Sequence, residues 1–355
     1  MAITDIIDLL QERAAVSGAR RALAWEPFEG APRSWTYRQF LADIRTVAAE
    51  LGARGVGVGD RVILHAENSP EFLLTWFACA WLGAVCVVTN PKSAGPELAY
   101  FAQHTGAVGA VTQPAYAATL REHCGALQWV VVAEDGWLGA GDCARRAIAE
   151  RPTIPAREPG SMMFTSGTTS RPKAVVWSRA NALWAAQSGV RNAGLVADDV
   201  ALVFVPLYHV VGLAWSVLPA LAAGAAIVLQ PRFSASRFWP VAQQHRATFA
   251  SHVQFSSGVL ARMPAPASHA FRLWGNSTWL PEYESHFGVP LMGWWGMTEV
   301  VAPGIVGSVG QPQQPGTIGR VAPGYDARIV DDEGNPVAPG TAGELLLRGV
   351  PGETL

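Results

Sequence analysis

The chain has 355 residues, of which 50% are hydrophobic and 15% charged, and its formal net charge is −2. This balance excludes a strongly basic surface of the kind that binds nucleic acid, and an acidic composition typical of disorder. The length and the hydrophobic content favour one large folded unit with subdomains around a substantial core.

The N-terminal sequence and the spacing of the cysteines indicate the cellular compartment in which we expect the protein. Residues 1–15 place Asp5 and Asp8 among apolar residues, which predicts an amphipathic helix rather than a signal peptide with its leading positive charge. The cysteines include no Cys-x-x-Cys pair, and they are Cys79, Cys86, Cys124 and Cys143. We therefore expect reduced thiols in a cytoplasmic protein.

Two apolar stretches approach the length of a membrane span. Residues 72–88 contain Gly83, and residues 200–229 contain Pro206 and Pro219. A lipid-facing helix needs about 20 apolar residues with satisfied backbone groups. We therefore expect both stretches to form buried strands and helices of an α/β core, and we expect no membrane span.

The first half of the chain alternates predicted helices and strands. Residues 35–51 show helical periodicity after an extended start, and the glycine-rich residues 52–59 end that helix. Further helices are predicted over residues 69–82, 95–105 and 114–123, and strands over residues 61–65, 84–88, 108–112 and 129–133. This alternation implies parallel sheets with helices on both faces. Residues 135–159 are expected to form an irregular connector.

The second half continues the alternation and then changes character. Helices are predicted over residues 179–189, 213–223 and 234–245, and strands over residues 200–205, 225–229, 248–251, 271–274 and 289–293. From Gly304 onward prolines and glycines become frequent, and short runs at residues 327–330 and 344–348 flank a turn. This pattern is typical of antiparallel β structure and predicts a small barrel-like subdomain.

Residues 161–174, SMMFTSGTTSRPKA, combine a strand end with a polar loop. The apolar residues 162–164 suit the end of a buried strand. The loop that follows can bind a phosphate, because it offers N–H groups, hydroxyls, close backbone approach at Gly167 and a positive charge at Arg171 or Lys173. Its spacing is not that of a P-loop, since no Gly-Lys-Ser/Thr follows four residues after a glycine. Composition alone equally allows an ordinary polar loop.

The loop resembles the Thr-Ser-Gly-Thr-Thr-Gly-x-Pro-Lys-Gly signature of adenylate-forming enzymes, the AMP-binding superfamily of acyl-CoA synthetases, luciferases and peptide-synthetase adenylation domains. Ser170 and Ala174 stand where the signature has glycines, and the Thr-Thr-Ser-Arg-Pro-Lys form is similar to that of crotonobetaine/carnitine–CoA ligase relatives. The resemblance implies that the loop binds ATP phosphates. It assigns this role to Thr165, Ser166, Gly167, Thr168, Thr169 and Lys173, with Thr165 and Lys173 also catalytic.

A second stretch, residues 293–299 (GWWGMTE), resembles the family's aromatic-Gly-x-Thr-Glu motif, with a tryptophan where tyrosine is usual. An indole offers area for stacking on adenine, and a carboxylate suits Mg²⁺ bound to phosphate oxygens. The resemblance assigns nucleotide contacts to Trp295, Gly296, Met297 and Thr298, and metal binding and catalysis to Glu299. Without the loop match, two core tryptophans and a solvated glutamate would explain the stretch equally well.

A third stretch, residues 206–212 (PLYHVVG), resembles the family loop that lines the acyl pocket near the reacting carboxylate. A lone histidine in apolar surroundings is seldom a general base, so the catalytic role expected of His209 is to shape the pocket and position the carboxylate. The expected substrate pocket comprises His209, Gly212, Trp274 and Trp294. The family's adenine-binding loop would correspond to Gly275, Asn276 and Ser277, but the usual Gly-Ala-Ala-Pro-Leu motif is absent from this sequence.

The resemblance covers most of the family's large N-terminal domain. Relatives continue to a Thr-Gly-Asp motif whose aspartate binds the ribose, then to a hinge and a lid domain with a catalytic lysine, whereas this sequence ends at Leu355. We therefore expect an AMP-binding large domain of two α/β subdomains over residues 1–303, the start of a barrel-like subdomain over residues 304–355, and no lid in this chain. The implied fold is α/β, with two mostly parallel sheets layered with helices as αβαβα.

The implied function is that of an acyl-CoA synthetase that uses ATP, Mg²⁺ and coenzyme A to activate a small carboxylic acid. The sequence does not determine the oligomeric state and leaves a homodimer open. One alternative is an amino-acid or aryl-acid adenylation domain that loads a carrier protein. The third stretch lacks the usual aspartate after phenylalanine, and Met297 stands where those domains have proline, which favours the CoA ligase. The other alternative is a nucleotide-binding domain without turnover.

Overall fold

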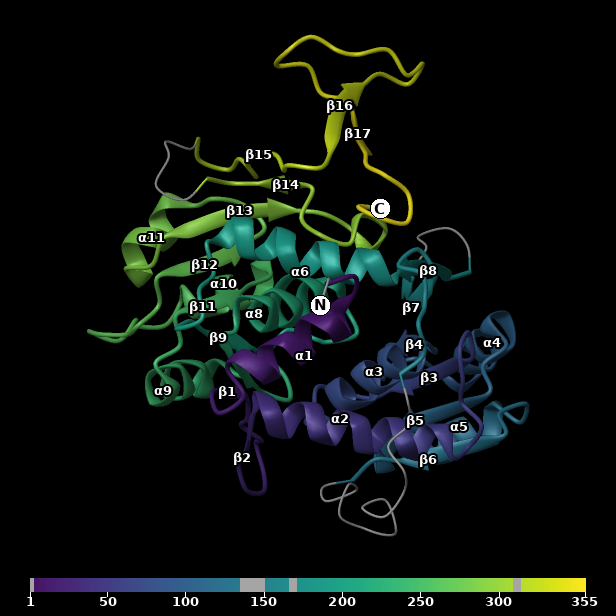
Figure 1. Cartoon of the computed structure of the whole chain (residues 1–355). Coiled ribbons are helices and arrows are strands. Elements are labelled where there is room, and N and C mark those ends of the chain that lie inside the picture. The colour runs from purple at the N-terminus through teal and green to yellow at the C-terminus, as the bar shows by residue number, and fades with distance from the viewer. Residues whose placement is uncertain (1–2, 135–150, 166–170, 309–313) are drawn as a thin grey trace.

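The computed structural model describes residues 3–134, 151–165, 171–308 and 314–355, which form two large sheets layered with helices (Figure 1). The smaller sheet is parallel except for its last strand, which pairs antiparallel with its neighbour. Its order is β6 (Trp129–Val132), β5 (Gly109–Thr112), β3 (Arg61–His65), β4 (Val85–Thr89), β7 (Pro159–Thr165) and β8 (Lys173–Ser178).

The larger sheet has nine strands, parallel in its centre and antiparallel at both edges. Its order is β15 (Arg320–Val321), β14 (Ile305–Val306), β13 (Leu291–Trp295), β12 (Leu273–Asn276), β11 (Phe249–Ser251), β9 (Val200–Val203), β10 (Ala226–Leu229), β1 (Arg21–Trp25) and β2 (Arg33–Thr36). The predicted pair of mostly parallel sheets is therefore confirmed.

Helices fill the space between the sheets and cover both outer faces, which gives the predicted five layers. The inner helices are α1 (Ile6–Val16), α2 (Tyr37–Gly52), α3 (Pro70–Leu82), α6 (Arg179–Ala193) and α8 (Leu218–Ala223). On the smaller sheet lie α4 (Gly95–Thr105) and α5 (Pro114–His123). On the larger sheet lie α9 (Ala235–His245), α10 (Gln254–Leu260) and α11 (Pro281–Phe287).

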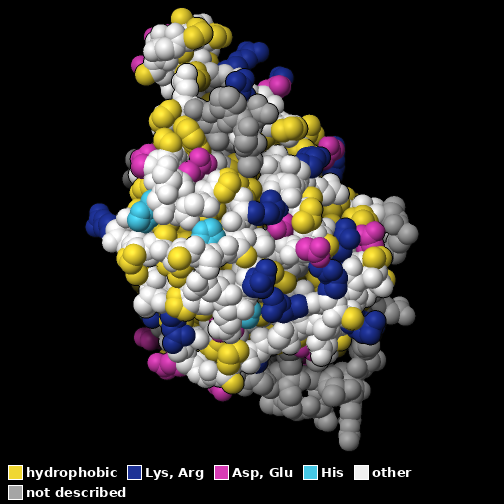
Figure 2. All heavy atoms as spheres, turned by 90° about the vertical axis from the view of Figure 1, so that its left-hand side faces the viewer, with side chains coloured by type: hydrophobic (Ala, Val, Ile, Leu, Met, Phe, Trp, Pro, Cys, Tyr) yellow, Lys and Arg dark blue, Asp and Glu magenta, His cyan; other side chains and the backbone are white. Residues whose placement is uncertain are grey.

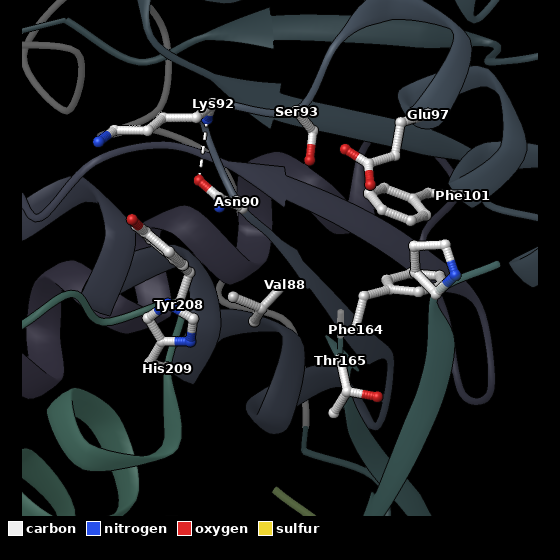
Figure 3. Close-up of a pocket in the computed structure, with 11 residues that line it drawn as sticks. Val88, Asn90, Lys92, Ser93, Glu97, Phe101, Phe164, Thr165, Tyr208 and His209 are labelled. Atoms are coloured by element: carbon white, nitrogen blue, oxygen red, sulfur yellow. Dashed lines mark hydrogen bonds between the residues drawn. The ribbon is translucent and has the colours of Figure 1, made fainter. Parts of the chain in front are cut away.

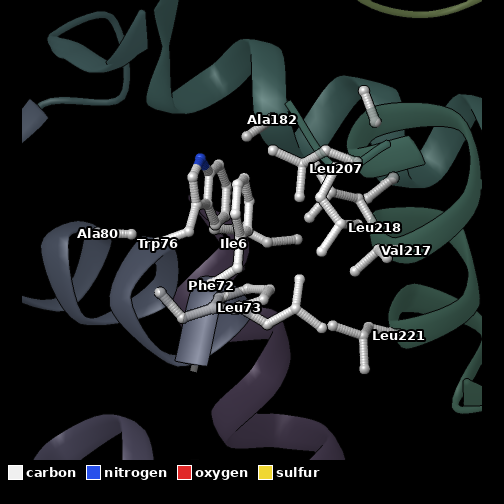
Figure 4. Packing of buried hydrophobic residues seen from close by; sticks show 14 of the residues in the cluster. Ile6, Phe72, Leu73, Trp76, Ala80, Ala182, Leu207, Val217, Leu218 and Leu221 are labelled. Atoms are coloured by element: carbon white, nitrogen blue, oxygen red, sulfur yellow. The ribbon is translucent and has the colours of Figure 1, made fainter. Parts of the chain in front are cut away.

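The inner layer is where the two halves of the chain pack together. Figure 4 shows apolar side chains of α1 and α3 facing those of α6, α8 and the segment before α8. The residues labelled there are Ile6, Phe72, Leu73, Trp76 and Ala80 on one side and Ala182, Leu207, Val217, Leu218 and Leu221 on the other. Burial of such side chains stabilises a fold by about 1.5–3 kcal/mol each. This core fixes the relative position of the two sheets.

Local sequence signals set the ends of α3. The Ser69 side chain accepts a hydrogen bond from the Phe72 N–H, and Pro70 occupies the first turn, where its missing N–H has no cost. Gly83 ends the helix at φ +76°, a left-handed conformation that side chains other than glycine's resist. These ends agree with the predicted helix over residues 69–82.

Several elements differ from the prediction. The strands β1, β2 and β8 and the helices α10 and α11 were not expected. The expected helix over residues 213–223 begins as α7 (Val210–Gly212) and the π-helix η3 (Leu213–Val217) before it becomes α8. Pro219 lies in the first turn of α8 and has no N–H to donate. The Ser216 hydroxyl, in the π-helical segment, donates to the Val211 carbonyl at 2.6 Å.

The C-terminal region is antiparallel, as predicted. The strands β14 and β15 extend the larger sheet, while β16 (Asp326–Val330) and β17 (Glu344–Arg348) form a separate two-stranded sheet that projects from the body (Figure 1). Among the described residues these strands do not close into a barrel. The boundary between residues 303 and 304 stays a prediction.

The other expectations from composition concern the membrane, the thiols and the charges. Within the ranges that the structure describes, no helix combines the length and the hydropathy required to cross a membrane. Cys79, Cys86 and Cys124 are buried free thiols, and Cys143 lies outside the described residues. Figure 2 views the face that carries α9 and α11, where side chains of both charges are interspersed.

A buried ionic cluster ties the N-terminal helix to the second half of the chain. Asp5 caps α1 by accepting from the N–H groups of Ile7 and Asp8. The same carboxylate accepts from the guanidinium of Arg179, the first residue of α6, and from Arg151 at 2.5 Å. Asp5 and Arg179 are each 3% exposed. Charges this deeply buried are stable only while they remain paired.

We predict that Asp5→Asn lowers the free energy of unfolding by about 3–5 kcal/mol, the usual cost of leaving a buried charge unpaired. Asparagine caps helices as well as aspartate does, so the substitution removes the charge and keeps the cap. Urea unfolding measures the change. The control is Glu12→Gln on the same helix, an exposed carboxylate 3.7 Å from Arg13. Equal stability of the two variants would contradict the role of the buried pair.

Candidate functional site

The strongest candidate site is a pocket of about 150 Å³ where strands of both sheets end (Figure 3). Val88 and Asn90 come from the end of β4, Phe164 and Thr165 from the end of β7, and Tyr208 and His209 from the loop after β9. Ligands of α/β proteins commonly bind at the carboxyl ends of parallel strands. The structure therefore brings Thr165 and His209, predicted from two separate motifs, into one pocket.

The predicted phosphate loop connects β7 to β8 as a hairpin. Thr165 and Lys173 are directly opposite each other at the open end of its ladder. Lys173 is exposed, and its ammonium group has no ion pair or hydrogen bond among the described residues. The predicted phosphate ligands Ser166, Gly167, Thr168 and Thr169 lie outside the described residues.

Helix α4 supports both strands of this hairpin. The Phe101 ring stacks on Phe164 with 3.9 Å between the ring centroids. The Tyr100 hydroxyl donates to the Pro172 carbonyl at 3.1 Å, and the Arg171 guanidinium lies 5.5 Å from the centre of the Tyr100 ring. Both ends of the predicted phosphate loop are therefore anchored on a rigid element, as a preorganised binding loop requires.

A single buried amide holds the loop that carries His209. The Asn68 side chain donates to the carbonyls of Val205 at 3.0 Å and Gln230 at 3.1 Å, and its oxygen accepts from the Leu207 N–H at 2.7 Å. Asn68 follows β3 of the smaller sheet, whereas its partners follow β9 and β10 of the larger one. Asn68 was not predicted from the sequence, in which its signal is a polar side chain shortly after a buried strand.

The environment of His209 favours its neutral form. His209 is exposed at the pocket and its ring lies 4.6 Å from the Tyr208 ring between centroids. The protein on its inner side lowers the pKa of His209 below the ordinary 6.5 by desolvation. Burial, and then the Glu67 carboxylate, raise the pKa of the Tyr208 phenol, which therefore stays protonated. At neutral pH the pair offers uncharged donors and acceptors to a ligand in the pocket.

Gly212 has a structural reason to be glycine. It is buried, and a Cβ at this position would lie 2.2 Å from the Pro206 carbonyl oxygen and 2.9 Å from that of Val205. The backbone of residues 206–212 therefore folds back on itself more closely than any side chain allows. Gly212 shapes the loop of His209 and does not itself line the pocket of Figure 3.

The predicted metal ligand Glu299 lies in a short 3₁₀ turn after β13, η4 (Thr298–Val300). Its carboxylate is exposed and makes no hydrogen bond or ion pair among the described residues. Among all the residues that the structure describes, no three or more His, Cys, Asp or Glu side chains lie close enough together to hold a metal ion by themselves. Mg²⁺ in proteins typically uses one or two carboxylates and completes its coordination with waters and phosphate oxygens of the substrate, so the exposed Glu299 carboxylate has the chemistry that this ion needs.

Residues 295–298, which precede Glu299, combine close packing against two buried tryptophans with side chains that remain exposed. Trp295 ends β13 and is partly exposed, as a stacking surface must be. A Cβ on Gly296 would lie 2.7 Å from the Trp215 ring. Met297 is 44% exposed, and the Thr298 carbonyl accepts from the Trp177 indole at 2.8 Å. This geometry leaves Trp295 and Met297 accessible to a ligand.

The two tryptophans expected in the substrate pocket pack elsewhere. Trp274 is fully buried on the outer face of the larger sheet, with ring centroids 4.3 Å from His252 and 4.7 Å from Phe287. Trp294 is buried in the inner core, 5.4 Å from the Trp215 ring. Among the described residues neither lines the pocket with His209. Strand register decides which face a side chain occupies, and the sequence alone did not fix it.

The expected adenine loop follows β12. A Cβ on Gly275 would lie 2.1 Å from the Trp294 ring, so this glycine makes room for the indole. Asn276 is buried, and its side chain accepts from Ser257 and donates to the Thr278 carbonyl, both at 3.2 Å. Ser277 is partly exposed. Packing alone accounts for the first two residues, and nucleotide binding by the three stays a prediction.

The chain is similar to known proteins over nearly its whole length. A family described as "AMP-binding enzyme" matches residues 10–351. Crotonobetaine/carnitine–CoA ligases of Salmonella enteritidis PT4 (strain P125109) and Salmonella typhimurium (strain LT2) are each 31% identical over 373 residues, which cover 99% of this chain and 72% of the relative.

Solved structures match the fold. A benzoate CoA ligase from Burkholderia xenovorans LB400 has a TM-score of 0.87 at 21% identity, covering 98% of this chain and 71% of that one. An O-succinylbenzoate coenzyme A synthetase from Bacillus subtilis, in complex with AMP, has a TM-score of 0.83 at 24% identity, covering 98% and 87%. At these identities the matches support the layered α/β architecture alone.

We predict that Gly212→Ala destabilises the protein by about 1–3 kcal/mol, the usual cost of overpacking a tight site. The new methyl group would meet backbone, which cannot rotate away as a side chain can. The control is Gly125→Ala, because no atom lies within 4 Å of a Cβ there and its φ is not positive. Urea unfolding of both variants tests the prediction, and an unchanged Gly212→Ala protein would refute the proposed close packing.

Proposed function

The chain belongs to the AMP-binding enzyme family and is an AMP-forming acid–CoA ligase, and on this premise we propose that it activates a small carboxylic acid for transfer to coenzyme A. In the first step a carboxylate oxygen attacks the α-phosphorus of ATP, and the bond to the β-phosphate breaks. Pyrophosphate leaves with the electron pair, and an acyl-adenylate forms. In the second step the thiol of coenzyme A loses its proton and attacks the acyl carbon, and AMP leaves.

The observation that carries this proposal is the shared pocket of Thr165 and His209. One is the last residue of the strand before the predicted phosphate loop, and the other belongs to the predicted acid-positioning loop. Acyl-adenylate formation requires that a carboxylate and an α-phosphate meet in line, and holding two reactants in this way supplies much of the rate enhancement. A pocket lined by residues next to both loops supports the proposal that the carboxylate and the α-phosphate are held side by side there.

The roles of the chain's residues follow from their chemistry. Lys173, together with the N–H and hydroxyl groups of the predicted phosphate loop, would hold the β- and γ-phosphates. The partly exposed Trp295 would stack on the adenine. Thr298 would donate to the α-phosphate, and Glu299 would hold Mg²⁺. When bound, Mg²⁺ neutralises charge that develops on the phosphates. The neutral His209 would position the carboxylate without a proton transfer.

The identity of the acid is a finer proposal. The curated relatives are named for crotonobetaine and carnitine, which favours a small, polar acid. The lining of the pocket supports this choice, since Asn90, Lys92, Ser93 and Glu97 supply polar groups beside Phe101 and Phe164. A panel of carboxylic acids in a pyrophosphate-release assay would rank the candidates.

We predict that Glu299→Gln lowers Mg²⁺-dependent adenylate formation by about 10²–10³-fold, the usual effect of removing one preorganised electrostatic contact. The fold should persist, because Glu299 is exposed and unpaired among the described residues. Pyrophosphate release across a Mg²⁺ titration measures the effect. The control is Glu333→Gln in the turn between β16 and β17, also exposed. Activity near that of the control would exclude Glu299 as the metal ligand.

We predict that Trp295→Ala weakens AMP binding by about 1–3 kcal/mol, the scale of stacking between a base and an aromatic ring. Calorimetric titration with AMP measures the affinity without any turnover. A matched control is Trp129→Ala, which removes a partly buried indole from β6 in the other sheet. If both variants bind AMP as the parent does, Trp295 serves packing alone.

A further inference from the structure

The turn that bears Glu299 is held by three aromatic side chains from distant parts of the chain. The Trp177 indole donates to the Thr298 carbonyl at 2.8 Å, and the Trp215 indole donates to the Val301 carbonyl at 2.8 Å. The Tyr325 hydroxyl lies 2.8 Å from the Val300 carbonyl. These aromatic residues are 1%, 5% and 7% exposed, so water competes little for their carbonyl partners. Three of the four carbonyls of residues 298–301 thus have a buried aromatic partner.

The turn needs such support because its backbone is strained. Val301 has φ +64° and ψ −60° and is fully buried. The Ala302 N–H donates to the Val300 carbonyl at 2.7 Å, which closes a γ-turn around Val301. A β-branched residue at positive φ is a rare conformation that costs on the order of 1–3 kcal/mol and persists only where the surroundings impose it.

Trp177 differs from the other two residues because of the strand it lies on. It belongs to β8, which begins at Lys173 at the end of the predicted phosphate loop. Its hydrogen bond reaches the residue immediately before Glu299. One strand therefore connects Lys173, which is predicted to bind phosphate, to the turn of the predicted metal ligand through a buried hydrogen bond.

We propose that Trp177 is a positioning residue that holds the turn of Glu299 in register with strand β8, so that Glu299 and Lys173 keep a fixed separation. The inference rests on the proposed function of Glu299 and the hairpin. Mg²⁺ demands near-ideal octahedral geometry, so a small displacement of its carboxylate costs affinity. Trp177 touches neither nucleotide nor metal in this role and acts through Thr298.

The test uses Trp177→Phe, which removes the indole N–H and keeps an aromatic ring. We expect ATP to bind about threefold to tenfold more weakly in the presence of Mg²⁺, the equivalent of one lost hydrogen bond. Binding of ATP in EDTA should weaken less, because only the contact of Thr298 with the nucleotide, and not that of Glu299 with the metal, is then affected. Calorimetric titrations under both conditions measure the difference. The control is Trp35→Phe, which breaks a 2.7 Å indole bond to Asp43 near β2 at the far edge of the larger sheet.

A double mutant separates positioning from general packing. If Trp177 acts through Glu299, then Trp177→Phe should change Mg²⁺-dependent ATP binding by less than about twofold in a Glu299→Gln background. Additive effects, or equal losses with and without Mg²⁺, would overturn the proposal. No loss in Trp177→Phe relative to the Trp35→Phe control would overturn it as well. If Glu299→Gln alone weakens Mg²⁺-dependent ATP binding while Trp177→Phe does not, the metal assignment stands and the positioning role fails. If Glu299→Gln alone has no effect, the metal assignment fails, and the positioning of Glu299 by Trp177 fails with it.

Discussion

The candidate site depends on the bridge that Asn68 makes between the two sheets. A buried amide that satisfies two carbonyls and one N–H on the far side of the pocket cannot move without leaving polar groups unpaired. Such unpaired groups typically cost about 1–3 kcal/mol each. The bridge therefore fixes the β9 loop with His209 against the sheet that carries Thr165. The pocket between them is a product of this contact and of the helical layer that the sheets share.

The site combines rigid supports with groups that remain free. Helix α4 anchors the hairpin through Tyr100 and Phe101, and three aromatic side chains anchor the turn of Glu299. Lys173 and Glu299, the charged groups at the two ends of this arrangement, are exposed and unpaired among the described residues. Preorganised charges on a fixed scaffold are what phosphate and metal binding require. The strain at Val301 is consistent with a turn held for function rather than for stability.

Local signals predicted much of the fold, and long-range packing accounts for the rest. Ser69, Pro70 and Gly83 mark both ends of α3 because caps are local. Strand β8 was missed because its side chains do not alternate between buried and exposed. Trp274 was misplaced because its face depends on register. In the site, Thr165 and His209 were each predicted from a local motif, whereas Asn68 and Trp177 act through partners more than 100 residues away, which no local pattern reveals.

The central claim is that the β7–β8 hairpin and the turn of Glu299 form one Mg²⁺–nucleotide site beside the pocket of His209. A crystal structure of the chain with ATP and Mg²⁺ tests it most directly. The predicted result has the adenine against Trp295, the β- and γ-phosphates at the hairpin near Lys173, and the metal between Glu299 and the phosphates. Nucleotide bound away from these residues, or a metal with no contact to Glu299, would contradict the claim.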